Sequence, residues 1–125
     1  MSTEPIDVIR EFCAAFGKGQ PDLDRIVGFF TEDAVYHNIP VDPVVGPDAI
    51  RTTLESFSTG VESIEFQVLA IAAAGGTVLT ERVDVFRYPG KEISLPVMGA
   101  FEVVDGKIAA WRDYFDMNQF MSQLG

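Results

Sequence analysis

Three glycine-containing turn dipeptides divide the second half of this chain into four apolar runs. The dipeptides are Gly75-Gly76, Pro89-Gly90 and Asp105-Gly106, and the runs cover about 61–73, 77–88, 92–103 and 107–115. Such dipeptides favour tight turns, so successive runs return beside one another as antiparallel neighbours. The second half is therefore expected to fold as a four-stranded antiparallel meander.

The N-terminal segment has helical periodicity instead. Apolar residues at the i, i+3, i+4 and i+7 spacing predict a first helix with an inward face formed by Ile6, Ile9, Phe12, Cys13 and Phe16. Thr3 is the candidate N-cap of this helix, and Gly17 and Gly19 are expected to close it.

The other elements follow from short local signals. One helix is expected after Asp22, another from Gly46-Pro47-Asp48, where proline suits the first turn, and a last one from about Asp116. Residues 34–38 are expected to form a short strand. Helices followed by a meander indicate an α+β fold with the helices packed on one face of the sheet. The chain is short enough for residues 1–125 to form a single domain.

Charge and cysteine content exclude several classes of function. The net charge is −10, from 9 basic and 19 acidic residues, which argues against binding to nucleic acids or to anionic membranes. Cys13 is the single cysteine, so no internal disulfide can form and a reducing compartment is expected. Neither a signal peptide nor a long apolar stretch is visible, so the sequence predicts a soluble cytoplasmic protein.

Three charged residues fall on faces that are otherwise apolar. Side chains alternate along a strand, so Arg82 and Asp84 share a face with Val78, Thr80 and Phe86. By the same alternation, Asp113 shares a face with Trp111 and Phe115 in the last run. Charges in such surroundings are expected to pair with one another inside the protein.

The turn at Pro89-Gly90 sets the first strand register. A two-residue loop pairs Tyr88 with Lys91, which places Asp84 opposite Leu95. Continuing the same register places Arg82 opposite Val97.

The turn at Asp105-Gly106 allows two registers. A two-residue loop places Asp113 beside Met98, whereas a three-residue loop with a bulged Gly106 places it opposite Val97. The second register is preferred, because it puts Val97 on the face that holds all three charged residues. It predicts a row of Arg82, Val97 and Asp113 across three strands.

In that arrangement the Arg82 guanidinium can hold Asp113 on one side and Asp84 on the other. If the two carboxyl groups share one proton, the cluster is neutral and offers an acid and a base at the same pH. A purely structural salt-bridge network explains the same spacing equally well.

Three sequence segments bear on the choice between a catalytic cluster and a structural salt-bridge network. Tyr36 to Pro40 (YHNIP), Glu81 to Val85 (ERVDV) and Trp111 to Asp116 (WRDYFD) resemble the signature segments of the limonene-1,2-epoxide hydrolase family. The resemblance runs in order along nearly the whole chain. It implies a curved mixed sheet with helices over its concave face, the cystatin-like or NTF2-like cone, and it also implies a homodimer.

The resemblance also implies a role for five residues. Asp113 is the expected general base that takes a proton from water, and Tyr36 and Asn38 are expected to hold that water. Asp84 is the expected general acid that protonates the epoxide oxygen, and Arg82 bridges the two aspartates. The implied reaction needs neither a metal nor an organic cofactor.

Further expectations come from face alternation and composition. The candidate walls of a substrate pocket are Phe86, Leu95, Val97 and Phe115. Neither a His/Cys cluster suited to a metal nor a glycine-rich dinucleotide loop is present. His37, the single histidine, is expected to point away from the site.

The sequence therefore predicts an enzyme that adds water to a small lipophilic epoxide and forms a vicinal diol. Two alternatives remain open. One is a ketosteroid-isomerase-like or polyketide-cyclase-like enzyme that uses an aspartate base on a carbonyl substrate. The other is a non-catalytic NTF2-like module that binds a lipophilic ligand.

Overall fold

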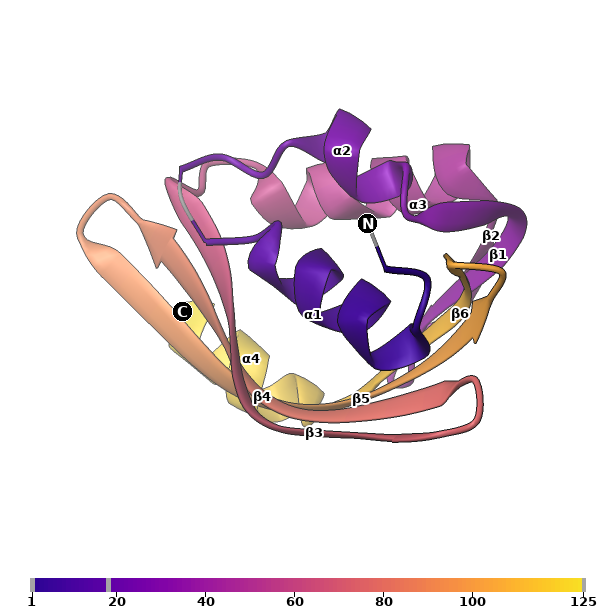
Figure 1. Cartoon of the computed structure of the whole chain (residues 1–125). Helices are drawn as coiled ribbons and strands as arrows, with labels where there is room; N and C mark the ends of the chain where they lie inside the picture. The colour runs from indigo at the N-terminus through magenta and orange to yellow at the C-terminus, as the bar shows by residue number, and fades with distance from the viewer. Residues whose placement is uncertain (1, 18, 125) are drawn as a thin grey trace.

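The computed structural model describes residues 2–17 and 19–124, which form helices packed on one curved sheet (Figure 1). The helices are α1 (Pro5–Ala14), α2 (Leu23–Val27), α3 (Pro47–Ser58) and α4 (Met117–Leu124). The strands are β1 (Phe30–Asn38), β2 (Val44–Val45), β3 (Ser63–Ala74), β4 (Thr77–Tyr88), β5 (Lys91–Val104) and β6 (Lys107–Tyr114).

The sheet is mixed, with the strand order β2-β1-β6-β5-β4-β3. The three tight turns give the expected antiparallel meander from β3 to β6, while β1 returns to pair with β6 in parallel. The sheet curves around α1, and α3 crosses its open side (Figure 1). The expected α+β fold, a curved mixed sheet with helices on its concave face, is confirmed. The described helices include none that is long and apolar enough to cross a bilayer.

Helix α1 fills the concave face with its periodic apolar residues. Phe12 is fully buried and meets the rings of Phe30, Phe101 and Trp111 at centroid distances of 4.9 to 5.9 Å, with its ring edge-on to them. Such edge-to-face aromatic contacts add to the stabilisation from apolar burial. The core therefore gathers on the concave face of the sheet, the face on which the charged residues were expected.

The start of α1 differs from the expectation. The N-cap is Glu4 and not Thr3, and no side chain caps the helix. Pro5 stands at the first helical position, where its fixed φ begins the helix without a capping hydroxyl. The helix also ends earlier than expected, at Ala14, ahead of Gly17.

The register between β4 and β5 is confirmed. Tyr88 pairs with Lys91 and Asp84 with Leu95, so the turn at Pro89-Gly90 has two residues, as expected. Arg82 likewise lies opposite Val97.

The preferred register between β5 and β6 is wrong. Asp105 and Gly106 both have positive φ (50° and 79°) and form a two-residue turn, so Val104 pairs with Lys107. A bulge then leaves Ala109 without an opposite residue and shifts the pairing by one. Asp113 consequently lies opposite Gly99, and the expected row with Val97 and Arg82 does not form. The expected face is nevertheless retained, because the bulge restores the inward direction of Asp113.

Candidate active site

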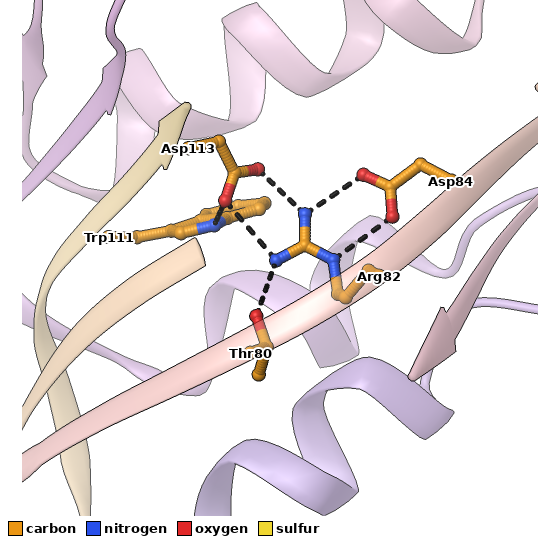
Figure 2. Close-up of polar contacts among 5 residues, drawn as sticks. All are labelled: Thr80, Arg82, Asp84, Trp111 and Asp113. Atoms are coloured by element: carbon orange, nitrogen blue, oxygen red, sulfur yellow. Dashed lines mark hydrogen bonds and ion pairs between the residues drawn. The ribbon is translucent and has the colours of Figure 1, made fainter. Parts of the chain in front are cut away.

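One buried arginine connects two strands at the centre of the concave face. Arg82 uses all five of its N–H groups (Figure 2). The Nε donates to Asp84 Oδ1 at 3.0 Å, and Nη2 donates to Asp84 Oδ2 and Asp113 Oδ2, each at 2.9 Å. The Nη1 donates to Asp113 Oδ1 at 3.2 Å and to Thr80 Oγ1 at 3.1 Å. This is the two-sided arrangement expected from the sequence, with the guanidinium shared between the two aspartates.

The three charged side chains are almost fully withdrawn from solvent. The exposed fraction is 0% for the Arg82 side chain, 6% for Asp84 and 5% for Asp113. Phe66 covers the guanidinium carbon, with its ring centroid 4.6 Å away. If both carboxylates are ionised, the cluster carries a net charge of −1 in an environment that penalises charge.

The two carboxyl groups are not equivalent. Asp113 Oδ1 accepts a further hydrogen bond of 2.8 Å from the buried indole Nε1 of Trp111 (Figure 2). Among the residues that the structure describes, both oxygens of Asp84 accept hydrogen bonds from Arg82 alone. Burial raises the pKa of Asp84 to about 6, against the opposing effect of Arg82, and the Asp113 charge raises it further. Asp84 therefore keeps a proton at a higher pH than an exposed aspartate does, because burial disfavours its ionised form.

A pocket opens directly above this cluster. The space within it measures about 530 Å³, the open solvent at its mouth included. Asp84, Asp113, Tyr36 and Asn38 are its polar lining residues. The apolar lining consists of Phe16, Leu54, Phe57, Ile64, Phe66, Phe86, Leu95, Val97, Phe115, Met117 and Phe120. Arg82 lies beneath this surface, so the carboxyl groups alone present the triad to a ligand.

The parallel pairing of β1 with β6 brings in the remaining polar residues. Tyr36 lies opposite Trp111 and Asn38 opposite Asp113, so both side chains enter the pocket beside Asp113. The Tyr36 ring stacks on Trp111 with centroids 4.0 Å apart. Burial, with the Asp113 charge as second cause, raises the pKa of the Tyr36 hydroxyl far above its ordinary value. Tyr36 therefore stays protonated and can donate a hydrogen bond.

His37 does not join the site. It alternates to the other face of β1, where its backbone pairs with Arg112. Within residues 2–17 and 19–124, no three His, Cys, Asp or Glu side chains are grouped so as to hold a metal ion.

The structure brings all nine sequence-predicted site residues together. Eight of them line the pocket, and Arg82 lies under it. Sequence reasoning missed the hydrogen bond from Trp111, although its position two residues before Asp113 on one strand was a usable signal. It also missed the pocket residues on α3 and α4, Phe57 and Phe120, because strand alternation carries no information about which helix covers the mouth.

Comparison with known proteins adds an independent line of evidence. Residues 3–125 match the family model described as the limonene-1,2-epoxide hydrolase catalytic domain. The chain is 34% identical to epoxide hydrolase EphG of Mycobacterium tuberculosis over 103 residues, which is 82% of this chain and 68% of that protein.

Solved structures agree with the sequence comparisons. The structure of an LEH-like epoxide hydrolase from M. tuberculosis is similar at a TM-score of 0.82 and 32% identity, and the match covers 98% of this chain and 90% of the other. An NTF2-like protein from Anabaena variabilis is similar at a TM-score of 0.78 and 20% identity, covering 92% and 91% of the two chains. At that identity the second likeness concerns the fold alone.

Proposed function

The chain belongs to the limonene-1,2-epoxide hydrolase catalytic-domain family, and from this premise we propose that it adds water to a lipophilic epoxide and forms a vicinal diol. The observation that carries the proposal is the pair of buried carboxyl groups, Asp84 and Asp113, joined by one guanidinium under an apolar pocket. Two carboxyl groups that differ in proton affinity can act as an acid and a base in one step.

Asp113 is the proposed general base. It accepts three hydrogen bonds, two from Arg82 and one from Trp111, and these fix the position of its carboxyl group at the pocket. The attacking water is placed beside Asp113, Tyr36 and Asn38, which all line the pocket. Asp113 takes one proton from this water as its oxygen attacks an epoxide carbon, and the two neighbouring side chains orient the attack.

Asp84 is the proposed general acid. Its raised pKa keeps part of the population protonated near neutral pH. As the carbon–oxygen bond of the epoxide breaks, Asp84 gives its proton to the leaving oxygen, and the diol is complete. One proton has then moved from Asp84 to the product and one from water to Asp113. The total charge of the buried cluster does not change during the step, so the low-dielectric site never holds an additional charge.

The pocket supports the lipophilic character of the substrate. Phe86, Leu95, Val97 and Phe115 line it, as their strand positions predicted, and Met117 and Phe120 of α4 extend the apolar lining. A hydrocarbon carrying one epoxide ring would place its reactive end against the carboxyl groups and bury the rest.

A covalent alternative to this mechanism needs a residue that the pocket lacks. In hydrolases that form an ester between an aspartate and the substrate, a histidine-activated water releases the product. His37 is the chain's single histidine and lies on the opposite face of β1. We therefore propose direct attack by water.

A single turnover in ¹⁸O-labelled water, with enzyme in excess over a lipophilic epoxide, tests the mechanism. Direct attack places the label in the first-turnover diol and leaves the peptides containing Asp84 and Asp113 unlabelled. An unlabelled diol would overturn the direct mechanism. Turnover of a ketosteroid or polyketide substrate, with no epoxide of a broad panel consumed, would overturn the function in favour of a carbonyl enzyme. Ligand binding with no turnover at all would favour a binding module.

We also propose that the protein is a single-domain homodimer that works in the cytoplasm. Supporting the dimer, the convex face of the sheet exposes three large apolar side chains, Leu79, Met98 and Tyr114, each about half exposed. A molar mass of one chain by light scattering would contradict it.

A further inference from the structure

Gly99 occupies the middle of β5, where its backbone gives no reason for a glycine. It pairs with Thr80 on one side and Asp113 on the other, and its φ lies outside the left-handed region. Any L-residue can adopt that conformation. Glycine in a strand interior weakens the strand and often marks a close approach by another group.

The group that approaches Gly99 is the Arg82 guanidinium. A Cβ at position 99 would overlap Arg82 Nη1, and it would lie 2.7 Å from Thr80 Oγ1 and 3.0 Å from Asp113 Oδ1. All three are polar side-chain atoms of the buried cluster. A methyl group at Gly99 would therefore occupy the space that the guanidinium now fills.

The strand register explains why this space is needed. Arg82 lies opposite Val97, whereas Asp113 lies opposite Gly99, one row further along the sheet. To reach Asp113, the Arg82 side chain must extend along the sheet until its guanidinium lies over Gly99. Thr80 stands in that row and accepts a hydrogen bond from Arg82 Nη1 at 3.1 Å, with 1% of its surface exposed.

We propose that Gly99 and Thr80 are positioning residues that hold the Arg82 guanidinium against Asp113. Gly99 leaves the space that the guanidinium occupies, and Thr80 accepts the hydrogen bond that fixes the guanidinium in this position. Neither residue lines the pocket, so both act through Arg82 and not on the substrate. This inference rests on the proposed function, because it assigns the contact between Arg82 and Asp113 a part in the reaction.

The loss should be selective within the cluster. Asp84 lies two residues from Arg82 on the same strand and binds Nε and Nη2. These two contacts do not require the guanidinium to extend over Gly99. A Cβ at Gly99 would displace Nη1 first, and Asp113 would lose its contact with that nitrogen. The base would then be misplaced while the acid and the pocket walls stay in position.

Steady-state kinetics of Gly99→Ala and Thr80→Val test the proposal, with Thr77→Val as the matched control. Thr77 is also on β4 and donates a 2.7 Å hydrogen bond to Glu102, away from the site. We expect kcat to fall on the order of 100-fold in Gly99→Ala and roughly tenfold in Thr80→Val, with KM nearly unchanged. Thr77→Val should retain normal kcat. Normal kcat in both test variants, or losses that appear in KM alone, would overturn the proposal.

A double-mutant cycle on stability separates this inference from the proposed function. Gly99→Ala should lower the urea midpoint when Arg82 is present and leave it unchanged or higher in an Arg82→Lys background, because lysine has no Nη1 over Gly99. An equal loss in both backgrounds would mean that Gly99 serves the strand and not the arginine. If the unmodified protein hydrolysed no epoxide, the proposed function would fail, and this cycle would still decide whether Gly99 makes room for Arg82.

Discussion

Strand β4 carries two arginines that each bind two carboxylates, and they differ in almost everything else. Arg82 faces inward and binds Asp84 and Asp113 with its side chain fully buried. Arg87 faces outward and binds Glu65 at 2.8 Å and Glu92 at 3.2 Å, with 36% of its side chain exposed. Five residues of separation place them on opposite faces of one strand.

The difference in burial reverses the effect on the acids. On the outer face, the hydrogen bond from Arg87 is the largest influence on Glu65 and lowers its pKa. On the inner face, burial is the largest influence on Asp84 and raises its pKa to about 6, although Arg82 binds it twice. The same ionic grouping thus lowers the pKa of an acid where water reaches it, whereas burial raises the pKa of an acid where water is excluded.

The largest expected effect on activity comes from replacing either acid that binds Arg82. Asp84→Asn and Asp113→Asn should each lower diol formation by on the order of 10² to 10⁴-fold, because each removes a proton-transfer group at nearly constant shape. Glu65→Gln and Glu92→Gln are the matched controls and should retain activity. Chromatographic measurement of the diol, with circular dichroism to confirm folding, checks this. Full activity in either asparagine variant would end the acid–base assignment.

Exchanging Arg82 for lysine should have the second largest effect, and Arg87→Lys is its control. A lysine ammonium cannot bridge two carboxyl groups as a planar fork does, so Arg82→Lys should lower kcat by roughly 100-fold. Arg87→Lys should leave kcat unchanged, because its grouping is exposed and remote from the pocket. If kcat fell equally in Arg82→Lys and Arg87→Lys, the difference in burial between the two arginines would not explain their effect on activity.

The residues proposed to hold the water should have a smaller effect. Tyr36→Phe and Asn38→Ala should each lower kcat by roughly tenfold, since each removes one orienting hydrogen bond and leaves proton transfer intact. Initial rates at saturating epoxide measure this. If Asn38→Ala had normal rates, Asn38 would have to be removed from the proposed site.

The smallest expected effect is a pH dependence of kcat/KM that is controlled by Asp84, which binds Arg82, and not by the acids that bind Arg87. The general acid must be protonated in the free enzyme, and the pKa of Asp84 is raised to about 6. The value of kcat/KM should therefore fall about fivefold between pH 6 and pH 7. The profile of Glu65→Gln should coincide with that of the unmodified protein. A flat profile over this interval would exclude Asp84 as the acid.

The sequence predicted the parts of this site that depend on alternation and on tight turns. The turn at Pro89-Gly90 placed Asp84 opposite Leu95 correctly, because a two-residue loop leaves no freedom of register. The predicted pairing of Asp113 with Val97 was wrong, because the bulge at Ala109 has no signature in the local sequence. Helix α4 was expected, but its place over the pocket depends on packing between segments distant in sequence, such as Phe120 against Phe57 and Phe86. Gly99 was overlooked because its significance appears only when Arg82 lies across it.

The hydrogen bond from Trp111 to Asp113 has a practical consequence. Trp111 is the single tryptophan of the chain, and it stacks on Tyr36 while its indole N–H contacts the proposed base. Indole emission responds to nearby charge and to the polarity of its surroundings, so the light emitted by this protein comes from the centre of the site. Entry of a ligand into the pocket and its departure can each be followed as a change in intrinsic fluorescence. The unmodified molecule thus carries its own optical reporter, in a position where an added dye would block the pocket.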